Sequence, residues 1–143
     1  MIFIKSFQIF KNAKNLKLTY CERFKKIICY SNFDTDDNIT PQLAIIDQTN
    51  EQIVHNKYFK DIILEITVSK CNNFFGVLLS NGEVIIYDTI NYTDVTKFYF
   101  EEVILPVEIN DDYGIRYDIE PHFLIIDFPN IFVGNKKILK IYS

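Results

Sequence analysis

Short apolar runs separated by turn-forming residues recur along the chain, most clearly between Lys60 and Phe100. Runs that are rich in Ile, Val, Phe and Tyr and bounded by Asn, Asp, Ser or Gly are typical of β-strands. Asn81-Gly82 is the strongest hairpin signal, because a type I′ turn needs positive φ at both central residues. The pattern predicts a four-stranded antiparallel meander, with strands at 62–69, 74–79, 84–88 and 95–100.

The same order of strands and turns continues on both sides of this meander. Upstream, the pattern predicts a long loop at 34–41 and strands at 16–20, 26–31, 42–47 and 51–59. Downstream, it predicts a first strand at 102–109, an insertion at 110–121 and a hairpin built from 123–133 and 136–142. Residues 1–10 form a further apolar strand without a partner of its own.

Four strands in about 40 residues is the size of one β-propeller blade. We therefore predict an all-β fold in one domain, residues 1–143, whose antiparallel four-stranded meanders resemble about three propeller blades. The approximate blades are 11–59, 60–100 and 101–143, with strand 1–10 completing the last one. A β-sandwich or barrel is the alternative, because hairpin patterning alone does not distinguish these packings.

Three blades fall short of a closed ring, since propellers have roughly 4–8 blades. A lone chain of this kind would leave apolar blade faces exposed at both ends. We therefore expect a protein partner, or a second copy of the chain, to complete the propeller.

Composition and charge narrow the classes of function. Hydrophobic residues make up 48% of the chain and charged residues 24%, which is a globular profile. The net charge of −4 gives no basic field for a nucleic-acid partner. The three cysteines lack C-x-x-C spacing, and the N-terminus lacks the features of a signal peptide, so we expect a cytoplasmic protein.

Side chains with catalytic or metal-binding chemistry are sparse. The two histidines, His55 and His122, lack Cys, carboxylate or histidine partners at a recognisable spacing, and we read them as structural. Asp34, Asp36 and Asn38 imitate the start of a calcium loop, but the sixth and twelfth positions lack the required Gly and Glu. The sequence therefore predicts no catalytic, cofactor or metal site.

The candidate binding residues lie in two acidic loops. They are Asp34, Asp36 and Asp37 in the first loop, and Asp111, Asp112 and Tyr113 in the second. Such loops are most simply exposed turns. As functional residues they would recognise a basic surface on a protein partner, so we predict a non-catalytic interaction scaffold.

Three apolar strings carry a resemblance to a known family: Gln42–Asp47, Ile63–Ile66 and Val77–Asp88. They resemble consecutive blades of a WD40-type propeller and are most similar to the PROPPIN family, the phosphoinositide-binding propellers of autophagy. The resemblance implies a propeller fold and, as the alternative function, reduced phosphoinositide and membrane binding. Lipid sites of that family flank a Phe-Arg-Arg-Gly motif. This chain contains no Arg-Arg pair, so the lipid site maps to none of its residues.

Overall fold

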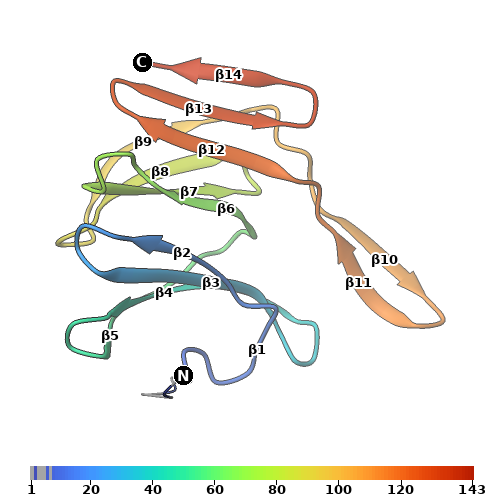
Figure 1. Ribbon diagram of the computed structural model, residues 1–143. Helices are drawn as coiled ribbons and strands as arrows, with labels where there is room; N and C mark the ends of the chain where they lie inside the picture. The colour runs from blue at the N-terminus through green and yellow to red at the C-terminus, as the bar shows by residue number, and fades with distance from the viewer. Residues whose placement is uncertain (1, 3–5, 7) are drawn as a thin grey trace.

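The computed structural model describes residues 2, 6 and 8–143, and within them the chain is all β, with fourteen strands and no helix (Figure 1). The strands form three blade-like sheets and one separate hairpin. Half of the predicted strand 1–10 lies outside the described residues, and the described residues 2, 6 and 8–10 are not in a strand. An all-β chain of antiparallel meanders is thus confirmed.

Blade 1 is the sheet formed mainly by β2 to β5, where each strand pairs antiparallel with the next. A short strand, β1 (Ala13–Lys14), adds to β3 and was not predicted. The blade's strands are β2 (Lys17–Cys21), β3 (Lys26–Asp34), β4 (Ile39–Asp47) and β5 (Gln52–Tyr58). The predicted long loop 34–41 is wrong, because β3 and β4 extend into it and leave only a tight turn.

Blade 2 confirms the predicted meander, in the order β6-β7-β8-β9. Its strands are β6 (Ile63–Val68), β7 (Phe74–Leu79), β8 (Glu83–Asp88) and β9 (Asp94–Tyr99). The hairpin at Asn81-Gly82 is present, but its turn is not type I′, since Gly82 alone of the pair has positive φ. The Gly82 N–H instead donates to the Leu79 carbonyl, at 2.9 Å.

Blade 3 has three strands in the described part of the chain, β12 (His122–Asp127), β13 (Asn130–Asn135) and β14 (Leu139–Tyr142). The prediction of one continuous strand over 123–133 is wrong, because the chain turns at Phe128-Pro129. The predicted first strand 102–109 is also wrong. Its end belongs to β10 (Val107–Asp111), which pairs only with β11 (Gly114–Asp118) in a separate hairpin.

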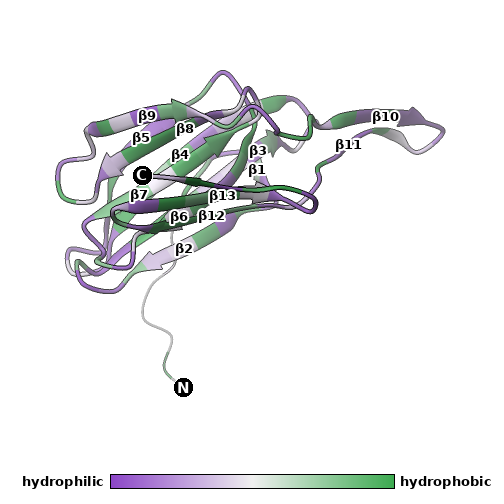
Figure 2. Cartoon of the chain, turned by 90° about the horizontal axis from the view of Figure 1, so that it is seen from above, coloured by the Kyte–Doolittle hydropathy of each residue, from purple (hydrophilic) through white to green (hydrophobic). Residues whose placement is uncertain are grey.

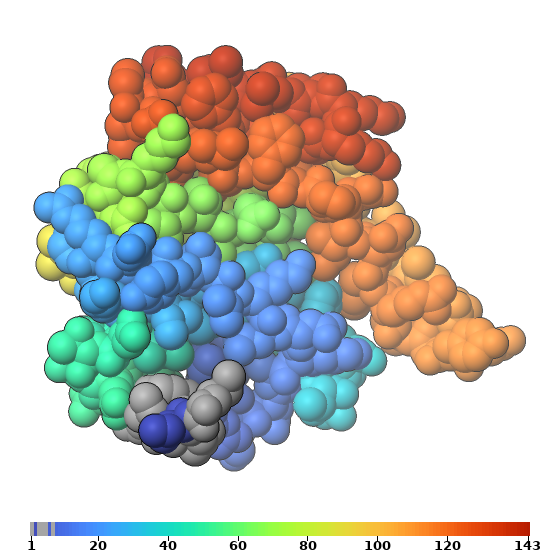
Figure 3. All heavy atoms as spheres, in the orientation of Figure 1, coloured from blue at the N-terminus to red at the C-terminus, as the bar shows by residue number. Residues whose placement is uncertain are grey.

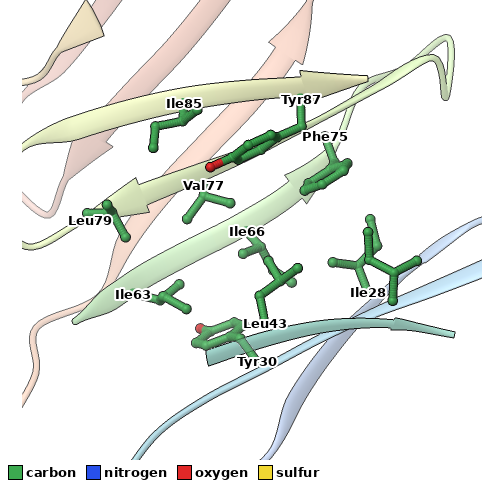
Figure 4. Close-up of a cluster of buried hydrophobic side chains, with 11 residues drawn as sticks. Ile28, Tyr30, Leu43, Ile63, Ile66, Phe75, Val77, Leu79, Ile85 and Tyr87 are labelled. Atoms are coloured by element: carbon green, nitrogen blue, oxygen red, sulfur yellow. The ribbon is translucent and has the colours of Figure 1, made fainter. Parts of the chain in front are cut away.

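The three blades follow one another in chain order, with blade 2 between the other two (Figure 1). β6 lies beside both β2 and β12, so the first strands of the blades line one side of the array. One apolar core fills the space between blades 1 and 2 (Figure 4), and a second fills the space between blades 2 and 3. The β10–β11 hairpin stands out from this body (Figure 2).

Candidate functional site

The first predicted binding loop is a tight turn organised by Asp34. Its carboxylate accepts hydrogen bonds from the backbone N–H groups of Asp36, at 2.9 Å, and Asn38, at 3.0 Å. The hydrogen bond from Asn38 is the main reason why the pKa of Asp34 is lowered. Asp34 therefore shapes the turn, whereas Asp36 is exposed and Asp37 forms an ion pair with Lys14.

The second predicted loop is the tip of the β10–β11 hairpin. Asp111 accepts a hydrogen bond from the Tyr113 N–H, at 2.9 Å, and forms an ion pair with Arg116, at 2.6 Å. Asp112 is exposed, and Tyr113 is 95% exposed at the tip. Of the three predicted residues here, Asp112 and Tyr113 are thus free to meet a partner.

The structure places the first loop beside the strands of the β10–β11 hairpin rather than beside its tip, which the sequence did not predict. The rings of Phe33 on β3 and Tyr117 on β11 stack with centroids 5.0 Å apart, and this contact holds the hairpin beside the β3–β4 turn (Figure 3). Between them lies an open cleft of about 410 Å³, which we call the acidic cleft. It is lined by Asp36, Asp37, Asn38, Ile39, Glu108, Ile115 and Tyr117.

The two segments that flank the acidic cleft carry most of the negative charge of the molecule, and three of their carboxylates, Asp36, Asp37 and Glu108, line the cleft. Residues 34–41 carry three carboxylates, and residues 107–118 carry four carboxylates and one arginine. These two segments therefore have a net charge of −6, whereas the whole chain has −4. The rest of the chain is slightly basic, so the electrostatic asymmetry points to this surface.

A second hollow lies where β2 and β6 face the segment that leads into β12. We call it the inner cavity; it measures about 490 Å³. Its lining includes Lys17, Leu18, Glu65, Ile66, Ile119 and His122. A smaller hollow between the two sites shares Ile119 with the inner cavity and Tyr117 with the acidic cleft. The inner cavity, this hollow and the acidic cleft therefore lie next to one another, and we call this row of hollows the groove.

His122 at the edge of the inner cavity is a satisfied structural histidine. Its Nε2 accepts a hydrogen bond from the Ile104 N–H, at 3.0 Å, which leaves Nδ1 as the donor to the Glu120 carbonyl, at 2.9 Å. The other histidine, His55, stacks on Tyr92, and burial is the main cause of its lowered pKa. Neither imidazole has a geometry that points to proton transfer.

Blade 3 presents an apolar face away from blade 2, which we call the open face. Leu124 and Ile126 point into the core, so the alternating residues of β12 point outward. The register of β12, β13 and β14 places five apolar side chains on this face: Phe123, Ile125, Phe132, Leu139 and Ile141. Ile125, Leu139 and Ile141 are 48%, 55% and 59% exposed. Single exposed apolar residues are ordinary, but a contiguous patch marks an interaction surface.

No group of three or more His, Cys, Asp or Glu side chains that is able to hold a metal ion occurs among residues 2, 6 and 8–143. In the same part of the chain there is no helix that is long and apolar enough to cross a membrane.

Comparisons with known proteins were made by sequence and by structure. No protein-family model matches the chain, and no curated protein matches it. Among solved structures, Saccharomyces cerevisiae Sqt1 matches 90% of this chain and 31% of its own, with a TM-score of 0.58 and 19% identity. Kluyvelomyces marxianus Hsv2 matches 93% of this chain and 36% of its own, with a TM-score of 0.52 and 10% identity.

Both structures are WD40-type β-propellers, so this chain has the fold of a partial β-propeller. It spans about a third of the length of the propellers it matches. Hsv2 is a PROPPIN, and the match confirms the predicted propeller fold, whereas the resemblance to the PROPPIN family itself stays a prediction. The lipid function implied by the resemblance stays a prediction.

Proposed function

We propose that this protein is an interaction scaffold in which a second copy of the chain covers the open face of blade 3 and completes the propeller. The open face carries the proposal. Leaving several large apolar side chains in water is unfavourable by about 25 cal/mol for each Å² of apolar surface. A partner that covers this face recovers that free energy.

The surface that fits the open face is another propeller blade. Inside the chain, blade 3 covers the matching face of blade 2, where Leu78, Val84 and Ile86 pack against Leu124 and Ile126. The open face has the same strand spacing and the same alternation of apolar residues. Packing of one β-sheet on another is therefore the contact that this face supports.

The second copy is the proposed source because apolar side chains at the rim of the far side of blade 1 are also exposed, although Cys29, Ala44 and Ile46 on that side are buried. By register, Tyr20 lies on the face of blade 1 that points away from blade 2, and it is 42% exposed. Tyr58 on the same face is 74% exposed. Two copies joined head to tail make a ring of six blades, within the roughly 4–8 blades of propellers.

Lysines on the open face are expected to abolish self-association. In the variant Ile125→Lys/Ile141→Lys, two ammonium groups would be buried without partners at the blade contact, which is strongly unfavourable. Sedimentation velocity at micromolar concentration should show a dimer for the unchanged chain and a monomer for the variant. Val107→Lys is the matched control, because Val107 is 58% exposed on the hairpin, and it should remain a dimer.

A variant of blade 1 tests the head-to-tail arrangement. Tyr20→Lys/Tyr58→Lys should dissociate the dimer as the open-face variant does, because each contact joins both faces. If only the open-face variant dissociates, the open face pairs with its own copy and the ring is wrong. A monomer of the unchanged chain would refute the self-association outright.

The acidic cleft is the part of this scaffold that we expect to bind a basic protein segment. Asp36 in the cleft and Asp112 at the adjoining hairpin tip are exposed and free of ion pairs among the described residues, so lysines of a partner can reach them. We predict that an octalysine peptide binds at low salt and that Asp36→Asn/Asp112→Asn weakens it about threefold to tenfold. Fluorescence anisotropy measures this, with Asp61→Asn/Asp94→Asn on another surface as the control. If the control variant loses as much affinity for the peptide, the acidic cleft is not the binding site.

The alternative, a reduced phosphoinositide-binding propeller, has less support. The net charge of −6 over the two loops opposes an anionic membrane surface at that site. We propose that the scaffold is not an enzyme and acts in the cytoplasm, as the sequence predicted.

A further inference from the structure

We propose that the inner cavity binds a single cationic side chain, lysine or arginine, from an extended segment of a protein partner, and that Glu65 is the residue that recognises it. The inference rests on the proposed scaffold function and adds a specific ligand chemistry. It assigns a role to a residue that the sequence pattern treats as an ordinary strand position.

Glu65 is a half-buried carboxylate without a cation in contact. Its Oε1 accepts a hydrogen bond from the Ile66 N–H, at 2.9 Å. None of the ion pairs in the described part of the chain involves Glu65. Burial raises the pKa of Glu65, and this outweighs the lowering by that hydrogen bond and by Lys17. A carboxylate held in this way is under-solvated, so an incoming cation gains more from it than from an exposed one.

The walls of the inner cavity suit the stem of a long basic side chain. Leu18, Ile66, Ile119 and Pro121 line it together with the carboxylate. Lys and Arg bury their methylene groups along apolar surface while the charged head meets a polar group. A cavity of about 490 Å³ has room for such a side chain with some water.

The other polar groups around Glu65 are either paired or neutral, apart from Lys17. Glu120 is paired with Lys136, at 3.2 Å, and His122 has both ring nitrogens engaged in hydrogen bonds. Tyr30 is buried, and burial is the main cause that raises the pKa of its phenol, so it stays neutral. Among the described residues, Lys17 is the one lysine or arginine that lines the cavity; it is exposed and forms no ion pair with Glu65.

The groove that joins the inner cavity to the acidic cleft favours a protein segment over a free small molecule. The two sites share the walls of one intermediate hollow, through Tyr117 at one end and Ile119 at the other. An extended peptide that places one basic residue in the inner cavity reaches the acidic cleft with residues further along. Such a peptide gains from both contacts, whereas a single amino acid gains from one.

The test uses N-acetyl-arginine amide as the probe, with methyl NMR of the intact protein. The probe should shift the methyl signals of Leu18 and Ile66, and Glu65→Gln should weaken its binding about tenfold, because a charge-assisted hydrogen bond is lost. Lys17→Met should strengthen binding, because it removes a competing cation. Glu83→Gln is the matched control, a half-buried glutamate on β8 outside the cavity, and should bind as the unchanged protein does.

A second binding experiment, with a peptide, distinguishes an arginine within an extended segment from a free arginine derivative. A peptide with one arginine and a lysine-rich tail should bind more tightly than N-acetyl-arginine amide and should lose that advantage in Asp36→Asn/Asp112→Asn. Equal affinities for peptide and amide would refute the extended segment. If Glu65→Gln binds the amide as well as the unchanged protein, the recognition by Glu65 is wrong, whatever the oligomeric state proves to be.

A second readout comes from folding stability. The pKa of Glu65 is higher in the folded state than in the unfolded chain, so the protonated side chain favours folding and the ionised one opposes it. The stabilisation by the protonated form is lost as the pH rises through the raised pKa. Glu65→Gln keeps an acceptor for the Ile66 N–H without the charge. It should therefore raise the melting temperature at pH 7 and have a smaller effect in acid. A lower melting temperature at pH 7 would contradict an unpaired, under-solvated Glu65.

Discussion

Replacing Asn32 with alanine is expected to lower the free energy of unfolding by about 2–5 kcal/mol, because two buried backbone groups lose their partners. The Asn32 side chain joins blade 1 to blade 2. Its Nδ2 donates to the Ile63 carbonyl, at 2.8 Å, and its Oδ1 accepts from the Ile63 N–H, at 2.7 Å. Asn32 is only 8% exposed, so water does not replace these hydrogen bonds.

A bulge in β3 explains how a side chain in one blade reaches the backbone of the next. The register between β3 and β4 shifts between Ser31 and Phe33, so Asn32 is left out of the ladder. Bulges of this kind re-aim a side chain without ending the sheet. The amide of Asn32 then pairs with Ile63 on β6 as a neighbouring strand would.

Urea unfolding followed by circular dichroism checks this prediction at a fixed protein concentration. Asn56→Ala is the matched control, because Asn56 is exposed on β5, and it should change the stability by less than about 0.5 kcal/mol. Asn32→Asp keeps the acceptor and loses the donor, so it should also destabilise the protein near pH 7. A change in Asn32→Ala no larger than in the control would mean that the two blades do not depend on this contact.

The sequence predicted blade 2 well because its local signals agree with its tertiary role. Each apolar run there is a single strand, and the turns between runs carry Asn, Gly or Asp. Both faces of the sheet are covered. Val77 is buried on the face toward blade 1, and Leu78, Val84 and Ile86 are buried on the face toward blade 3. Continuous apolar runs of this length indicate strands in such a setting.

Blade 3 was predicted less accurately because its turns have weaker signals. The run from Phe123 to Val133 contains Asp127 and Pro129 but no Gly, and it reads as one apolar stretch. In the structure the chain reverses there, with Asp127 paired to Asn130. Residues 107–118 carry turn residues and polar side chains, which look like an insertion loop, yet they form a regular hairpin.

The candidate site was predicted in part. The two acidic segments were selected from charge and turn chemistry, and their role in binding stays a prediction; Asp36, Asp111, Asp112 and Tyr113 are exposed, whereas Asp34 and Asp37 are half-buried. Their proximity depends on the stacking of Phe33 on Tyr117, a long-range contact that no local pattern encodes. Glu65 gave no signal either, because a single glutamate in an apolar strand normally faces solvent. Only the convergence of β2, β6 and residues 119–122 makes it a cavity residue.

The open face was the feature that the sequence indicated most directly. A propeller needs more than three blades to close, so a chain with three blades is expected to leave apolar blade faces uncovered. The structure shows one such face on blade 3. The alternation in β12 is visible in the sequence, with Phe123 and Ile125 alternating with Leu124 and Ile126. A strand that is apolar on both faces needs a partner on both sides. One of these partners is blade 2, and the other is the proposed second copy.

In the core between blades 1 and 2, Phe75→Ala is expected to lower the free energy of unfolding by about 3–5 kcal/mol. Phe75 is 2% exposed and its ring stacks on Tyr87, with centroids 5.1 Å apart. In Figure 4 it lies between the strands of blade 2 and the side chains of blade 1, near Ile28 and Ile66. Alanine leaves a cavity that the rigid sheets on both sides cannot close, so both the transfer term and the cavity term apply.

Chemical denaturation followed by tyrosine fluorescence measures this loss. Tyr99→Ala is the matched control, an aromatic residue in the same blade that is 56% exposed, and its cost should be much smaller. If Phe75→Ala fails to fold, Phe75→Leu gives a graded result, because a smaller apolar side chain that partly fills the space should cost about 1–2 kcal/mol. If Phe75→Leu lowers the free energy of unfolding as little as Tyr99→Ala does, blades 1 and 2 are not packed through this core. Since each blade is stable only against its neighbour, such a result would also remove the basis for a third contact on the open face.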